Sequence, residues 1–144
     1  PVARQSQNFS TTSHHWCMID IDSLPWDGDL HDHKAMVEYA SSQLPPEFQQ
    51  ADCLYHFSSS MGIKQGIRVH LWYWLERPCS DAEMKAWLSG CPVDLRLFNP
   101  IQIHLTANPQ FTEGATFILL IKCQLIFSLL ALFVGRFQRP RSFM

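Results

Sequence analysis

The stretch FSSSMGIKQGIRVHLWYWL, residues 57–75, decides the fold of this chain. Its second half alternates, with Ile67, Val69, Leu71, Tyr73 and Leu75 on one face and Arg68, His70, Trp72 and Trp74 on the other. Side chains along a strand point to alternate faces, so this pattern predicts a strand with one face in the core. The Ser- and Gly-containing residues 58–66 predict the turn that leads into it.

Further periodic segments lie on both sides of this strand. Strands are expected at 15–22, 53–57 and 101–106, with a short element at 94–98. Asp29 is expected to cap a helix over 30–44 that ends at Pro45. A capping box of Ser80 and Glu83 predicts a second helix that ends near residue 89, before Gly90. This order predicts an α+β fold, compatible with the ferredoxin-like split βαβ plan.

The composition indicates a single domain with a sizeable core. The chain has 144 residues, of which 47% are hydrophobic and 17% charged, which excludes a disordered, collagen-like or disulfide-stapled protein. The 11 Lys and Arg face 13 Asp and Glu, so there is no overall basic excess of the kind that marks nucleic-acid binding. Five cysteines without a CxxC pair argue against a disulfide framework and a zinc ribbon, and favour a reducing, cytoplasmic setting.

Two acids at the end of the first strand are the first candidate site. Asp20 and Asp22 are two residues apart, so their carboxylates share one face, with Cα atoms about 7 Å apart. Carboxylates placed in this way repel each other unless a cation lies between them, and hard oxygen ligands suit Mg²⁺ or Mn²⁺. The alternative is a strand that ends in two solvated acids.

A second candidate group lies on the 67–75 strand. Arg68 and His70 share a face, and a guanidinium beside an imidazole suits a triphosphate, with hydroxyls and N–H groups of the preceding turn as further donors. The alternative is that Arg68 pairs with a surface acid and that His70 lies in the core with its hydrogen bonds satisfied. Asp94 offers a third carboxylate for a two-metal site, although an isolated loop acid is usually solvated. Gln102, His104 and Thr106 form the polar face of the expected last strand, which lines a groove or faces solvent.

Taken in order, three segments resemble the archaeo-eukaryotic primase superfamily, especially the primase-polymerases of plasmids, phages and integrated elements. They are MIDIDS at 18–23, FSSSMGIKQGIRVHLWYWL at 57–75 and VDLRLFNPIQIHLTANPQF at 93–111. The family has an acidic DxD or DxE strand, a Ser- and Gly-bearing turn that leads into a His-containing strand, and a later acid. The resemblance covers residues 14–111, and its middle segment is the most specific part.

The resemblance implies a metal-dependent nucleotidyltransferase with an RRM-like antiparallel sheet backed by helices. Asp20, Asp22 and Asp94 would hold Mg²⁺ or Mn²⁺, and Arg68 and His70, with Ser58 or Ser60, would hold the incoming nucleotide. The partners it implies are nucleoside triphosphates, a single-stranded DNA template and a replicative helicase. Residues 1–110 carry 7 Lys and Arg against 12 Asp and Glu, which predicts a weak or partner-assisted grip on the template.

Two further functions and the ends of the chain remain open at this level. A non-catalytic module that binds single strands or initiates replication would use Trp72 and Trp74 for base stacking. A relaxase-type nuclease is the weakest hypothesis, because it needs a His-x-His pair beside a tyrosine, whereas Val69 and Leu71 flank the only histidine of the 67–75 strand.

Residues 1–13 form a polar lead-in, and 112–144 form an apolar and then basic tail. Within the tail, 117–134 is a membrane helix, a buried helix or a non-native continuation, and the chain is expected to be part of a larger domain.

Overall fold

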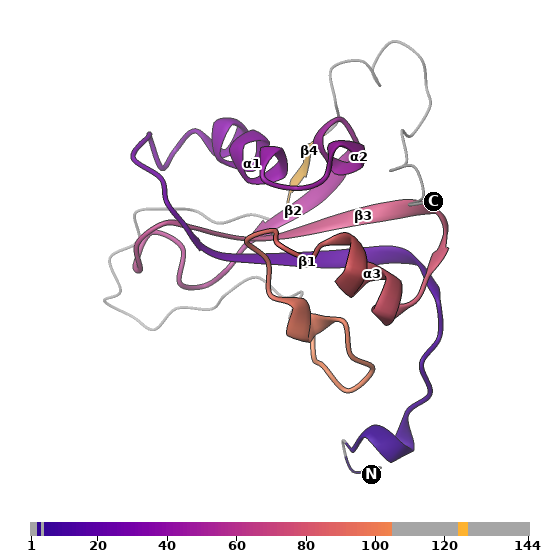
Figure 1. Cartoon of the computed structure of the whole chain (residues 1–144). Helices are drawn as coiled ribbons and strands as arrows, with labels where there is room; N and C mark the ends of the chain where they lie inside the picture. Colours follow the sequence, from indigo (N-terminus) through magenta and orange to yellow (C-terminus); the bar gives the residue numbers. More distant parts are fainter. Residues whose placement is uncertain (1–2, 4, 105–123, 127–144) are drawn as a thin grey trace.

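Strand β3 (Ile67–Cys79) lies inside an antiparallel sheet, as its alternating sequence predicts. A computed structural model describes residues 3, 5–104 and 124–126. Strand β1 (His14–Leu24) pairs with one side of β3, and β2 (Cys53–Phe57) pairs with the other. A short strand, β4 (Gln124–Ile126), pairs with β2, so the order is β1-β3-β2-β4 (Figure 1). The α+β class and the three main strands are confirmed.

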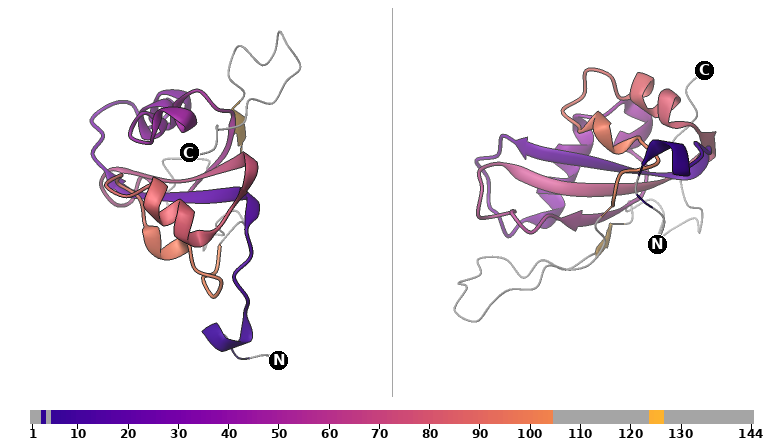
Figure 2. Two further views of the ribbon diagram at one scale, coloured as in Figure 1. Left: turned by 45° about the vertical axis from the view of Figure 1, so that its right-hand side comes forward. Right: turned by 90° about the horizontal axis from the view of Figure 1, so that it is seen from below.

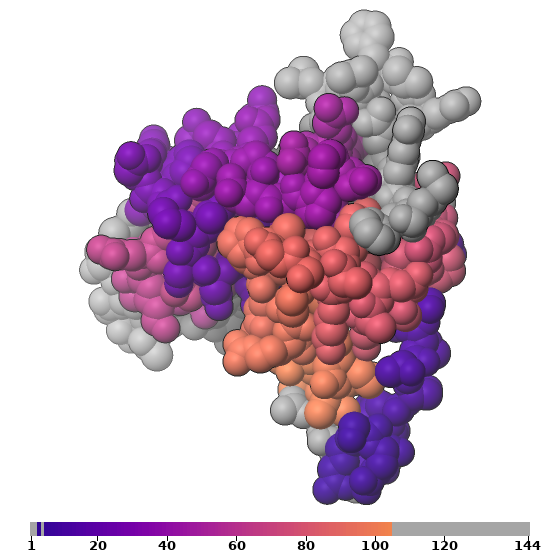
Figure 3. Space-filling view, viewed as in Figure 1, coloured from indigo at the N-terminus to yellow at the C-terminus, as the bar shows by residue number. Residues whose placement is uncertain are grey.

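One face of the sheet is buried beneath helices α1 (His33–Ser42) and α2 (Pro46–Gln49), which lie above it in Figure 1. The odd-numbered residues of β3 from Ile67 to Leu75 are all buried in the core, together with Met36 of α1 and Phe48 of α2. Helix α3 (Asp81–Trp87) joins the same core, because the rings of Trp87 and Phe48 lie 4.6 Å apart. The space-filling view shows this helical layer (Figure 3).

The other face of the sheet carries the even-numbered residues of β3. Neither α1 nor α2 covers this face, as the view from below shows (Figure 2, right). Strand β1 lies at the edge of the described sheet, where the 3₁₀ turn η2 (Leu95–Leu97) contacts it. The polar lead-in contains one 3₁₀ turn, η1 (Ser6–Asn8). The less covered face and the β1 edge together position the candidate site.

The first helix begins later than the sequence predicts. Its cap is Asp32, whose carboxylate accepts a hydrogen bond from the Ala35 N–H at 3.0 Å. Asp29 instead accepts from the His31 N–H at 2.8 Å and closes a separate turn, so the prediction of Asp29 as the cap is wrong. Both acids satisfy a nearby N–H, and local sequence alone does not distinguish the two positions.

The second predicted helix has the expected cap. The Ser80 hydroxyl accepts from the Glu83 N–H at 3.3 Å, and the Glu83 carboxylate accepts from the Ser80 N–H at 2.8 Å. The helix ends at Trp87, and Gly90 follows with a φ of 84°. The capping box is therefore confirmed, whereas the C-cap is Leu88, so the helix ends before the predicted residue 89 and Gly90 turns the chain beyond the cap.

The strand expected at 101–106 is not observed over its described part. Residues 101–104 lie outside any strand, and Asn99 turns the chain there by accepting from the Ile101 N–H and the Gln102 N–H. The rest of that strand lies outside the described residues. The fourth strand comes from 124–126, inside the predicted tail, and pairs with β2. In the ferredoxin-like plan the last strand pairs with the first, so that plan is not reproduced among the described residues.

Only residues 124–126 of the apolar run 117–134 fall within the described part of the chain, where they are extended. The rest of this run, for which the sequence suggests a membrane helix, a buried helix or a non-native continuation, lies outside the described residues. The longest described helix, α1, has ten residues, and no helix in that part of the chain has the length and apolar character needed to cross a membrane.

Candidate functional site

A row of three polar side chains crosses the less covered face of the sheet. In the strand register, Asp20 of β1 lies opposite His70 of β3, and His70 lies opposite His56 of β2. Directly opposed residues of antiparallel strands point to the same face. Three residues distant in sequence thus come together because β3 lies between the other two strands.

Asp20, the acid of this row, has a raised pKa. One of its carboxylate oxygens lies 3.5 Å from His70 Nε2. Burial, followed by the negative charges of Asp22 and Asp94, raises the pKa of Asp20 to about 6, although Arg68 and Arg96 act in the opposite direction. The three predicted metal ligands therefore lie close enough to repel each other, and a cation would relieve that repulsion.

Asp94 reaches this cluster through the backbone. Its N–H donates to the Asp20 carbonyl at 2.9 Å, along the outer edge of β1. Its carboxylate caps η2 and holds Arg96 at two points, with Nε to Oδ1 at 2.9 Å and Nη2 to Oδ2 at 2.8 Å. The hydrogen bond from Arg96 is the main cause of the lowered pKa of Asp94. The fold thus brings the third predicted acid beside the DxD strand.

Asp22 is paired with the predicted phosphate-binding arginine. Arg68 Nη1 donates to its carboxylate at 2.7 Å, and Nη2 donates to the Ser23 hydroxyl. Ser23 has a φ of 62°, a left-handed conformation that costs a non-glycine residue about 1–2 kcal/mol. Arg68 therefore links the acidic strand end to β3, and a phosphate would have to draw its guanidinium away from Asp22.

Ser58 and Ser60 lie in the turn before β3, with their hydroxyl oxygens 2.9 Å apart. The Ser58 N–H donates to the Arg68 carbonyl at 3.0 Å, which fixes the turn against β3. The structure thus places both serines near the backbone of Arg68, while their hydroxyls contact each other.

The described residues contain no group of three His, Cys, Asp or Glu side chains already arranged to hold a metal ion. Asp22 and Asp94 each hold a guanidinium. A metal would bind only if these ion pairs open. The carboxylates supply the hard oxygen donors that Mg²⁺ and Mn²⁺ prefer, and the pKa of Asp20 is raised first by burial and then by the negative charges of Asp22 and Asp94. The donor chemistry of the three carboxylates fits a divalent ion.

His56 belongs to the site but was not singled out from the sequence. It is only 5% exposed, its ring lies 5.7 Å from that of His70, and neither ring nitrogen has a hydrogen-bond partner among the described residues. Burial, followed by the charge of His70, lowers its pKa. The alternation of 53–57 already placed His56 on the face opposite Cys53, Tyr55 and Phe57, so the signal was present.

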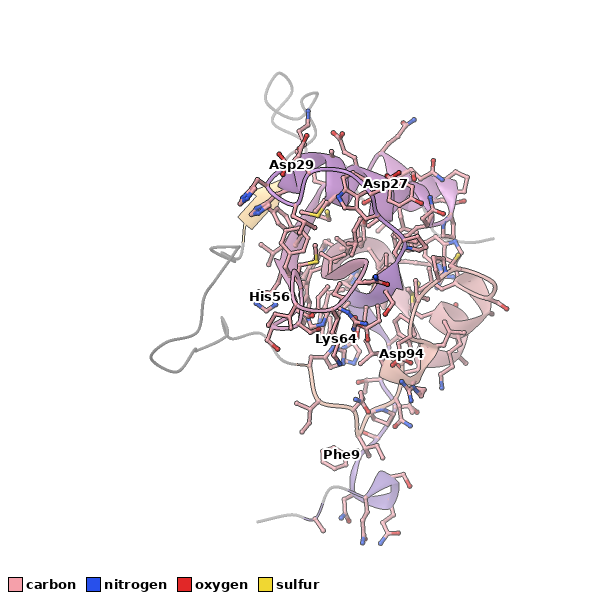
Figure 4. The ribbon with its side chains drawn as sticks, turned by 90° about the vertical axis from the view of Figure 1, so that its left-hand side faces the viewer. Phe9, Asp27, Asp29, His56, Lys64 and Asp94 are labelled. Atoms are coloured by element: carbon pink, nitrogen blue, oxygen red, sulfur yellow. The ribbon has the colours of Figure 1, made fainter. Side chains whose placement is uncertain are left out.

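An aromatic group continues the same face away from the acids. Trp16 of β1 and Trp72 of β3 lie 5.7 Å apart, and the ring of His104 lies 5.9 Å from each. Trp16 and Trp74, opposed in the register, are 40% and 43% exposed. In Figure 4, Lys64 is labelled between His56 and Asp94, and Asp27 and Asp29 lie above all three. The face thus combines an acidic end with an aromatic end.

No family model matches the chain, and no curated protein or solved structure is significantly similar to it. Its function therefore has to be inferred from its own residues.

Proposed function

We propose that the chain is a metal-dependent nucleotidyltransferase of the DNA primase or primase-polymerase type, with a primase-like fold, acting in the cytoplasm in replication of a mobile element. The observation that carries this proposal is the hydrogen bond from the Asp94 N–H to the Asp20 carbonyl. It brings a third carboxylate beside Asp20 and Asp22 from more than 70 residues away, in the order that the resemblance to primases implies. Three carboxylates that lie close together can bind the divalent ions that catalyse phosphoryl transfer.

The chain's own groups have distinct roles in this mechanism. Asp20, Asp22 and Asp94 would hold Mg²⁺ or Mn²⁺, which would supply charge neutralisation at the α-phosphate and activation of a 3′-hydroxyl. Arg68 and Arg96 already hold two of these carboxylates. When the carboxylates turn to a cation, the guanidiniums become donors for the phosphates of the incoming nucleotide, which bind arginine in two-point geometry. His70, beside Asp20, adds a further donor on the same face, and the Ser58–Ser60 turn adds hydroxyls.

The test is nucleotide incorporation on a single-stranded DNA template with Mg²⁺ or Mn²⁺. Asp20→Asn combined with Asp22→Asn should reduce incorporation at least about a hundredfold, because it removes charge that acts at the transition state. Glu76→Gln is the matched control, since Glu76 is an exposed acid on the same strand as His70. Incorporation by the double variant at the level of the control would refute the metal assignment.

A binding measurement separates metal affinity from activity. Saturation with Mn²⁺ at about a hundred times its dissociation constant should stabilise the folded chain by about 2.7 kcal/mol. The Asp20→Asn, Asp22→Asn variant should lose this stabilisation, whereas the Glu76→Gln variant should keep it. An equal Mn²⁺ response in both variants would place the ion elsewhere.

The exposed tryptophans favour a second candidate, a non-catalytic module that binds single strands. Trp16 and Trp74 present ring surface on an open sheet face, and stacking contributes about 1–3 kcal/mol per base. This function predicts oligonucleotide binding that is insensitive to EDTA and weakened at least about fivefold by Trp74→Ala. Phe9→Ala is the control, because Phe9 is equally exposed but lies in the lead-in, away from the sheet (Figure 4). Equal affinity of both variants would remove this candidate.

A further inference from the structure

An open pocket of about 840 Å³ lies beside the acidic cluster, at the end of the sheet that Figure 4 faces. Its walls come from two loops. One wall is formed by Ser23, at the end of β1, and by residues of the following segment 25–30, and the other is formed by residues 62–66, which precede β3. Arg68 also lines it, and the same guanidinium holds Asp22. The pocket and the candidate catalytic acids therefore share one arginine.

The apolar part of the pocket is a fixed aromatic ring and an exposed aliphatic side chain. The ring of Trp26 packs on Gly28, where an added Cβ would lie 2.5 Å from the ring, and lies 5.6 Å from the ring of Tyr39. Ile63, on the opposite loop, is 71% exposed, the highest value among the large hydrophobic residues of the described part. A side chain this exposed on a pocket wall is available to cover a flat apolar ligand group.

The polar part of the pocket is cationic on the loop before β3. Lys64 is exposed there, and Arg68 follows at the start of the strand, whereas Asp27 is the acid on the opposite wall. Gly62 and Gly66 have φ values of 75° and 80°, which lets the loop curve tightly on both sides of Lys64. Lysine and arginine side chains on one wall of a pocket favour a phosphorylated ligand.

We propose that this pocket binds the nucleoside part of a nucleoside triphosphate between Trp26 and Ile63, with the phosphates directed to Lys64 and Arg68. The planar base of such a ligand matches the ring of Trp26, and its triphosphate matches the two cations. The identity of the ligand rests on the proposed function, but the pocket itself does not. Trp26, Ile63 and Lys64 thereby become substrate-contacting residues that the primase resemblance does not assign.

The test is titration calorimetry of the full chain with ATP and, separately, with inorganic tripolyphosphate. Ile63→Ala should weaken ATP binding about fivefold and leave tripolyphosphate binding unchanged, because only ATP has an apolar group to lose contact. Lys64→Ala should weaken both ligands about fivefold or more. The matched controls are Ile103→Ala, at a 54% exposed isoleucine, and Lys85→Ala, at an exposed lysine on α3.

The outcomes separate this inference from the proposed function. If Ile63→Ala and Ile103→Ala bind ATP equally, or if ATP binds no more tightly than tripolyphosphate, the nucleoside site is refuted. Such a result, together with metal-dependent incorporation that needs Asp20 and Asp22, would leave the proposed function standing. Conversely, a selective loss of ATP affinity in a chain that incorporates no nucleotide with either metal would keep the pocket and refute the polymerising function.

Discussion

Gly66 should be among the residues least tolerant of a small substitution, because it lies against the backbone that follows Asp22. Its φ is 80°, and a Cβ added there would lie 2.6 Å from the Leu24 carbonyl oxygen and 2.9 Å from the Ser23 carbonyl carbon. These atoms belong to the main chain at the end of β1, so they cannot rotate away as a flexible side chain would. Gly66→Ala must therefore displace that strand end or its own loop.

The magnitude follows from two separate terms. The left-handed conformation costs alanine about 1 kcal/mol relative to glycine. Overpacking against the backbone adds about 1–3 kcal/mol, so Gly66→Ala should destabilise the fold by about 2–4 kcal/mol. Gly90→Ala is the matched control, because Gly90 has a φ of 84° and nothing within 4 Å of the added Cβ. It should cost only the conformational term, about 1 kcal/mol.

The assay is urea unfolding of both variants, followed by far-UV circular dichroism. The slope in urea should stay unchanged, and the midpoint of the Gly66→Ala variant should fall below that of the Gly90→Ala variant. Equal losses of stability in the two variants would refute the reasoning, since they would show that the contact with Leu24 yields at no cost. A loss confined to nucleotide binding, at unchanged stability, would also contradict it.

Three further variants test the core, the helix cap and the acid cluster. Ser80→Ala should cost about 1 kcal/mol because it removes the helix cap, whereas Ser89→Ala, at an exposed position beyond the helix, should cost little in the same urea assay. Tyr73→Phe should cost about 1 kcal/mol, and less in a Ser41→Ala background, because the two buried hydroxyls are hydrogen-bonded at 3.2 Å. Asp20 has a pKa of about 6 in the fold, above its ordinary value of 3.8, so its contribution to stability is present at low pH and is lost as the pH rises through 6. Asp20→Asn should therefore stabilise the chain by about 1–2 kcal/mol at pH 8, after allowance for partial exposure, and by almost nothing at pH 4; a constant difference across that range would contradict the shift.

The parts of the fold that follow from local periodicity were predictable. The alternation from Ile67 to Leu75 predicted which side chains of β3 enter the core, and the Ser80–Glu83 spacing predicted the cap of α3. The prediction of Asp29 as the helix cap failed because Asp29 accepts from the His31 N–H in a separate turn, whereas Asp32 accepts from the Ala35 N–H and caps the helix. The strand predicted at 101–106 is absent from its described part, 101–104, since Asn99 supplies local acceptors for two N–H groups there.

Some features of the candidate site follow from the local sequence, whereas others depend on contacts between distant segments. The sequence by itself determined that Asp20 and Asp22 share one face of their strand and that Arg68 and His70 share one face of theirs, because side chains alternate along any strand. Only the tertiary structure decided that Asp94 donates to Asp20, that His56 joins His70, and that Arg68 and Arg96 hold the acids. Those contacts depend on which strands are neighbours and on their register, and interactions between distant segments set both.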